Sequence, residues 1–253
     1  MSPVVLAALA LAALVIGISK TSVGGFAVIA VAVFASVMPA KESTAAVLLL
    51  LITGDLVAVQ RYRHAADWGL LRRLLPAVLP GVVLGAAFLW VVSDVVLRRT
   101  IGAIILALLV LQLVLRRRDA RLRASGSAAA DAPQADHPIA GPAVGLAAGF
   151  TTMTANAAGA VVALYLLAMR VEKLRFIGTG AWFFLIVNLA KVPFSAGLGL
   201  FPASTLWLTA GLAPVVLLGA WLGTHVTGRL SQQGFERAAL AGSAVAAASL
   251  LLR

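Results

Sequence analysis

The apolar run from Pro3 to Val37 constrains this chain most, because it is about twice as long as one membrane span of ~20 residues. A polar stretch, GISKTSVGG at Gly17–Gly25, interrupts it. Placing a lysine at membrane depth costs about 2.5–3.5 kcal/mol, whereas hydroxyl side chains can satisfy the backbone of a broken helix and glycines allow a turn. The run therefore predicts a broken helix whose ends bind a small ligand such as an anion. The polar and glycine residues of the break are Lys20, Ser19, Thr21, Ser22, Gly24 and Gly25.

The composition is that of an integral membrane protein. Of its 253 residues, 62% are hydrophobic and 11% are charged, whereas a soluble domain carries about 25% charged residues. The apolar runs are long and continuous, which favours helices over the alternating strands of a barrel. The first run has no Lys or Arg before it and continues past any cleavage site, so we interpret it as mature sequence. These features predict an all-α polytopic membrane protein.

A second interrupted run, Ile139–Met169, opens the second half of the chain. Between the two halves, residues 116–138 have almost no large apolar side chain and predict a flexible cytoplasmic linker. The sequence thus predicts a first repeat at 1–115, the linker, and a second repeat at 139–253. Three further spans follow each interrupted run, at about Ser43–Val59, Leu74–Val92, Thr100–Leu115, Phe176–Ala190, Thr205–Val226 and Ala238–Leu252.

The two halves resemble each other in sequence. GISKTSVGG aligns with GFTTMTANA in the second run, so that Gly17 falls on Gly149. The turn MPAK, ending at Lys41, falls on RVEK, ending at Lys173, and PGVVLG matches PVVLLG further on. The shared order and nearly constant offset indicate a duplicated unit.

The basic residues fix an orientation for this unit. The formal charge is +11, but the 20 Lys and Arg residues sit mostly in short loops, as in the cytoplasmic loops of membrane proteins rather than a nucleic-acid surface. The loops at 60–73, 116–138 and 170–175 share the cytoplasmic side only if each interrupted run enters and leaves on the same side. Either a re-entrant hairpin or two short spans would do this. The repeats are then inverted, with the N-terminus outside.

Inverted repeats with a broken helix in each half occur in many secondary transporters, whose substrate binds near the midplane where the breaks meet. Lys20 is the candidate positive charge, although it could instead snorkel to the interface. The hydroxyls could bind substrate or only repair the backbone, and the glycines could serve close packing. The candidate substrate-binding residues are Lys20, Ser19, Thr21, Ser22, Gly24, Gly25, Thr151, Thr152, Thr154, Asn156 and Asn188.

Asp55 is the candidate for ion coupling, because it is the only acidic residue at membrane depth. It could take up the coupling ion, pair with Lys20 in the empty protein, or lie at the cytoplasmic boundary and hold Arg61 six positions on. Asn188 and Lys191 lie in the second-half span that aligns most nearly with Asp55, and Asn188 could line the site. Lys191 is interpreted as an interfacial anchor.

Several other functions do not fit. The chain has no cysteine, and no two of its three histidines are placed to share a metal, so we expect neither a metal site nor a cofactor. An intramembrane protease would need a second aspartate or a histidine near its serine, and Ser19 has none in its layer. We therefore do not expect an enzyme. A passive anion channel remains open as an alternative, distinguished by flux without a proton or sodium gradient.

Four segments resemble the TauE/SafE family of sulfite and organosulfonate exporters: GISKTSVGGFAVI, the TGD and RYRHAADW motifs within 53–68, PGVVLGA, and GTGAWFFLIVNLAKVPF at 178–194. The resemblance covers nearly all of the chain except the linker. Family members often have a longer glycine cluster after the first half-helix, where this chain has only Gly24 and Gly25. The resemblance implies ion-coupled export of a small sulfur-containing or carboxylate anion, such as sulfite, thiosulfate or an organosulfonate, across a bacterial-type inner membrane.

The predicted topology can be tested by cysteine labelling, since the chain has no cysteine of its own. Ser2→Cys is expected to react with a membrane-impermeant maleimide from outside intact cells, and Ser127→Cys only after the cells are opened. Equal reactivity of both variants in intact cells would contradict the inverted arrangement.

Overall fold

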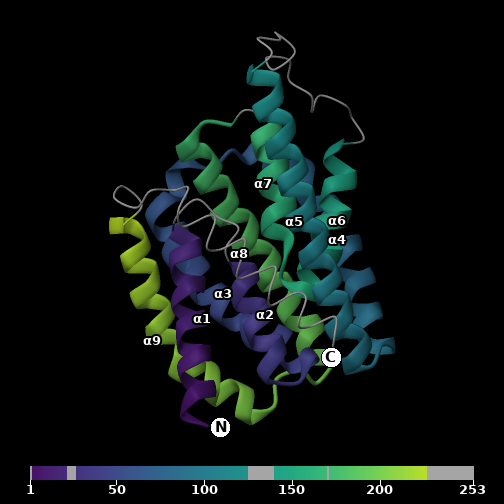
Figure 1. The fold of residues 1–253 in the computed structure, drawn as a ribbon, viewed down its shortest axis with the longest axis vertical. Coiled ribbons are helices and arrows are strands. Elements are labelled where there is room, and N and C mark those ends of the chain that lie inside the picture. The colour runs from purple at the N-terminus through teal and green to yellow at the C-terminus, as the bar shows by residue number, and fades with distance from the viewer. Residues whose placement is uncertain (1, 22–26, 125–139, 170, 227–253) are drawn as a thin grey trace.

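The computed structural model describes residues 2–21, 27–124, 140–169 and 171–226. Within these residues the chain forms helices and no strand, which confirms the all-α prediction (Figure 1). The predicted span at 238–252, most of the linker, and Ser22, Gly24 and Gly25 lie outside the described residues. The helices are α1 (Pro3–Thr21), α2 (Ala27–Val37), α3 (Ala40–Tyr62), the 3-10 turn η1 (Arg63–Ala65), α4 (Trp68–Val91), α5 (Asp94–Ala124), α6 (Ala140–Ala155), α7 (Ala158–Ala168), α8 (Lys173–Gly197) and α9 (Ala203–Val226).

Five stretches of helix in the described residues are long and apolar enough to cross a membrane, at 19 to 26 residues each. At 1.5 Å per residue the shortest is about 28 Å long, close to the ~30 Å hydrocarbon core of a bilayer. Large apolar side chains such as Trp90, Trp207 and Trp221 point away from the bundle and are more than half exposed, as expected of surfaces that meet lipid. The five stretches are Pro3–Thr21, Ala40–Ala65, Trp68–Val91, Leu174–Gly197 and Ala203–His225.

Each interrupted run forms a longer helix followed by a short one. In the first run α1 has 19 residues and α2 has 11, and in the second run α6 has 16 and α7 has 11. A helix of 11 residues is about 16 Å long, so neither α2 nor α7 can cross the ~30 Å core alone. The start of α2 lies against the end of α1, where the Ala27 N–H donates to Ser19 Oγ at 3.2 Å. The sequence left the form of these runs open, and the structure favours hairpins with a half-length second arm.

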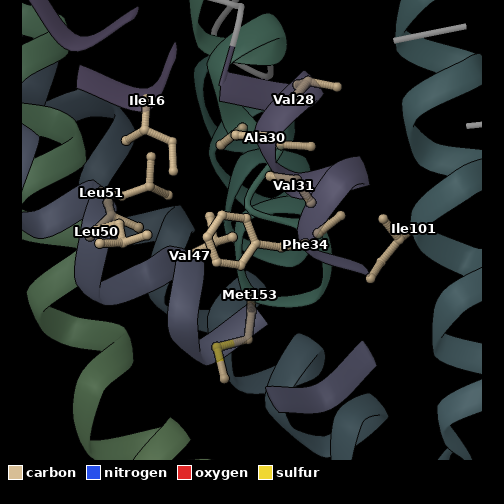
Figure 2. Packing of buried hydrophobic residues seen from close by; sticks show 14 of the residues in the cluster. Ile16, Val28, Ala30, Val31, Phe34, Val47, Leu50, Leu51, Ile101 and Met153 are labelled. Carbon is tan, nitrogen blue, oxygen red and sulfur yellow. The ribbon is translucent and has the colours of Figure 1, made fainter. Parts of the chain in front are cut away.

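The short helix α2 lies inside the bundle rather than on its surface. Phe34 is fully buried and points toward Val47 and Leu50 of α3, as Figure 2 shows. Val31 and Ile101 belong to the same buried cluster, which ties α2 to α5. Because α2 is packed on several sides, it is held within the core.

Two helix pairs, α1 with α9 and α4 with α6, make the most extensive contacts. In both pairs a glycine brings two backbones together. A Cβ atom on Gly17 of α1 would collide with the carbonyl oxygen of Val216, and one on Gly149 of α6 would collide with that of Val78. Small residues allow such close approach in membranes, where association relies on packing. The two aligned glycines of the sequence therefore have the same role in the two halves.

The ends of the bundle can be assigned from contacts between helices. At one end, the carboxylate of Asp94 accepts hydrogen bonds from the N–H groups of Ala40 and Lys41, both at 3.1 Å, at the start of α3. At the other end, the Asp67 N–H donates to Thr179 Oγ1 of α8 at 2.8 Å. The helix α5 runs from the first end and finishes at the top of Figure 1. It continues to Ala124, into the predicted linker, because Arg, Leu and Ala are good helix formers.

The glycine contact between α1 and α9 predicts the effect of one added methyl group. Gly17→Ala is expected to destabilise the protein by about 2 kcal/mol or more, since backbone must move to admit the methyl group. Gly211→Ala on α9 is the matched control, because no atom lies within 4 Å of its Cβ position. Thermal unfolding in detergent measures both. Equal unfolding temperatures for the two variants would contradict the close contact.

Candidate functional site

A buried ion pair joins α1 to α3. Lys20 Nζ lies 2.6 Å from Asp55 Oδ1, with the lysine side chain 9% exposed and the aspartate side chain fully buried. Gly54 makes room for the lysine, since a Cβ there would lie 2.9 Å from Lys20 Cγ. Of the three arrangements considered for Asp55, the structure contains the pairing with Lys20 and not one with Arg61. An ion pair taken out of water must be well matched to offset its desolvation.

The other carboxylate oxygen of Asp55 connects the two halves of the chain. Asn188 Nδ2, from α8, donates to Asp55 Oδ2 at 2.7 Å, and both side chains are buried. The carbonyl oxygen of the same amide accepts from Lys191 Nζ at 3.3 Å. Lys20, Asp55, Asn188 and Lys191 thus form one continuous polar chain that joins α1, α3 and α8, which we call the central polar chain.

Lys191 belongs to the central polar chain, although its sequence position was interpreted as an anchor at the membrane interface. It is 1% exposed and is therefore not an interfacial anchor. Besides Asn188, its ammonium donates to Asn156 Oδ1 at 2.6 Å and to Thr152 Oγ1 at 3.2 Å. These three acceptors match the three donors of an ammonium group. One sequence signal could have found it, because Lys191 follows Asn188 by three positions and so shares its helix face.

Asn156 shapes the second break. Its φ of +48° is the one positive value found for a non-glycine residue among those the structure describes, and asparagine tolerates this left-handed conformation better than most residues. Its side chain is held on both sides, since Nδ2 donates to the Thr44 carbonyl at 2.9 Å and Oδ1 accepts from Lys191. The turn between α6 and α7 is therefore fixed by side-chain hydrogen bonds to α3 and α8.

The other predicted polar residues divide into two groups. Thr21 Oγ1 donates to the Ala220 carbonyl of α9 at 2.8 Å, while Thr151 and Thr154 donate to Ala147 and Phe150 one turn earlier in α6, at 2.7 and 2.8 Å. These three hydroxyls serve the backbone. By contrast, a cavity is lined by Ser19, Lys20, Asp55, Thr152, Asn156 and Asn188.

The cavity has a volume of about 80 Å³ and lies between the two breaks. Ala27 and Gly159, at the starts of α2 and α7, reach it as well. Most of its apolar wall comes from α8, with Val28 of α2 and Leu51 of α3. The wall includes Phe184, whose ring centroid is 4.5 Å from Lys20 Nζ, within the range of a cation–π contact. Since a cavity of ~150 Å³ holds a benzene ring, this one suits a ligand of only a few heavy atoms.

A comparison with protein families identifies the family of the chain. The family model "Sulfite exporter TauE/SafE" matches residues 9–250, nearly the whole chain. The chain belongs to the TauE/SafE family. This TauE/SafE protein is therefore an integral membrane transporter, as its apolar helices indicate, and membership is consistent with the expectation that it is not an enzyme. Comparisons with curated proteins and with solved structures gave no match.

Among the described residues of this TauE/SafE protein, no three His, Cys, Asp or Glu side chains lie close enough together to hold a metal ion. The charged groups of the site are thus the two lysines and the aspartate.

The buried ion pair predicts a rescue experiment. Asp55→Asn is expected to destabilise the protein by about 3 kcal/mol, because it leaves the Lys20 ammonium buried without its counter-charge. Adding Lys20→Met removes the unpaired charge and is expected to restore most of the loss. A double-mutant cycle of thermal unfolding measures the coupling. Additive effects of the two substitutions would contradict a direct pairing.

Proposed function

We propose that this protein is a secondary transporter that exports a small sulfur-containing or carboxylate anion, such as sulfite, thiosulfate or an organosulfonate. The observation that carries the proposal is the position of Lys20, which lines a small cavity between the two breaks. Its present partner is a carboxylate of the protein, whose place an anionic substrate can take. The family match supports the same class of substrate.

The charges of the site favour a bound anion. The central polar chain contains two lysines and one aspartate, so one positive charge has no buried partner when both ammonium groups are protonated. Unpaired charge is costly in a membrane interior, and an anion in the cavity would balance it. The N-terminal ends of α2 and α7 also reach the cavity, where the positive ends of helix dipoles favour negative charge. Ser22, Gly24 and Gly25 would add donors from the first break.

The helix packing supports inverted repeats at 1–115 and 139–253. The helix α1 runs parallel to its partner α9, because residues 14, 17 and 21 meet residues 219, 220 and 223 in the same order. In the same way α6 runs parallel to α4, which begins at the end of the bundle opposite to the start of α9. Each first helix thus packs on the fourth helix of the other half, in opposite directions. The substrate site would then lie at the midplane, with the N-terminus outside and the linker cytoplasmic.

Asp55 is the proposed coupling residue. When a substrate anion takes over Lys20, the carboxylate loses its counter-charge inside the membrane. The other positive charge, Lys191, reaches Asp55 only through Asn188, so H⁺ or Na⁺ taken up at Asp55 would replace the lost direct contact. Anion movement and cation movement are linked by this exchange of partners, which a passive channel would not require.

Transport by the purified protein tests the proposal. In proteoliposomes, saturable uptake of labelled sulfite, thiosulfate, a sulfonate or acetate is expected for at least one anion, and a pH or sodium gradient should change its rate. Lys20→Ala is expected to lower the rate at least tenfold, because the cation facing the cavity is lost.

Lys41→Ala is the matched control, since Lys41 is in the same half but does not line the cavity. Monodisperse elution of each variant in detergent shows that it is folded. An anion flux that is the same with and without a pH or sodium gradient would instead identify a passive anion channel. Unchanged flux in folded Lys20→Ala protein would reject Lys20 as the anion-binding residue.

A further inference from the structure

Lys191 sits in a cage of oxygen atoms at the second break. Its Nζ has three oxygens within hydrogen-bond distance: Asn156 Oδ1 at 2.6 Å, Thr152 Oγ1 at 3.2 Å and Asn188 Oδ1 at 3.3 Å. The side chain is 1% exposed, and the lysine itself does not line the cavity, whereas its three acceptors do. The ammonium therefore lies behind the residues that line the cavity and not in the cavity itself.

The oxygen atoms come from positions where a transporter with broken helices can hold a metal cation. Two of them belong to the end of α6 and to the turn before α7, and the third belongs to the helix that crosses beside this turn. Carbonyl and hydroxyl oxygens are the ligands that hard cations prefer, and unwound segments coordinate sodium in several transporter folds. Here the cage is filled by a cation that is part of the chain.

Among the residues that the structure describes, few charged groups lie near Lys191. From α3, Asp55 reaches it through Asn188, and from α1, Lys20 adds a second positive charge beyond the aspartate. The helices α6 and α7, which supply the break, contain no charged residue. A sodium ion added to this neighbourhood would therefore meet two ammonium groups and only one carboxylate.

We propose that the Lys191 ammonium is a resident cation that occupies the position of a bound sodium ion at the second break, so that the transporter works without sodium. The role of Lys191 in transport rests on the function proposed above. The cage of oxygen atoms around its ammonium is a property of the folded protein and does not depend on that function. The cation that replaces Lys20 beside Asp55 is then a proton.

Cation binding to the purified protein tests this without any transport assay. Lys191→Ala removes the ammonium and leaves the oxygens, so the variant is expected to gain thermal stability, by several degrees, in sodium or methylammonium chloride relative to choline chloride. The wild-type protein is expected to show no such shift. Lys191→Ala combined with Thr152→Val keeps the shape of the site but removes one oxygen, and is expected to lose the gain.

Two results would overturn the proposal: a wild-type protein that sodium stabilises, or a folded Lys191→Ala variant that responds to no cation. If the variant does not fold, the unfolding temperature of the wild-type protein still tests the proposal. A higher unfolding temperature in sodium chloride than in choline chloride would reject it, and an equal one is expected. Failure of sulfite and the other anions to be transported would reject the proposed function, yet it would leave this binding result standing. The two failures are therefore distinguishable.

Discussion

Charge buried in an apolar bundle is the constraint on which the centre of this structure depends. Lys20, Asp55 and Lys191 lie among helices that are otherwise almost wholly apolar, and each has a partner of complementary charge or hydrogen-bonding capacity. An isolated charge at this depth would cost several kcal/mol, so the partners decide whether the fold is stable at all. The helix arrangement can be understood as the means of bringing these partners together.

The two broken helices supply what regular helices could not. In a continuous helix the backbone groups bond within the helix, whereas α6 ends just before Asn156, whose side chain bonds to α3 and α8. The first hairpin places Lys20 at the end of α1, facing α3. Residues at or beside the two helix breaks, one in each half of the chain, therefore contribute to the site.

The sequence predicted the elements of this site better than their partners. Hydropathy located the spans that form α3, α4, α8 and α9, and polar residues within apolar runs located the breaks, because these signals are local. The span predicted at Thr100–Leu115 lies within α5, which is not among the five stretches that are long and apolar enough to cross a membrane. Pairing with Lys20 was one of the alternatives for Asp55, but the sequence could not favour it over Arg61, since a spacing of six positions along one helix says nothing about a neighbouring helix. Lys191 was misplaced for a related reason, because hydropathy does not separate a buried lysine from one at an interface. The helical part of the linker, up to Ala124, was obscured by its charge.

The contacts of Gly17 and Gly149 limit how the protein can move. Backbones that touch directly cannot slide past each other without a clash, so α1 is locked to α9 and α4 is locked to α6. Each locked pair contains one helix from each half of the chain. Any rocking motion that opens the cavity to alternate sides would then displace one mixed pair against the other. The units that move would then not coincide with the two halves of the sequence.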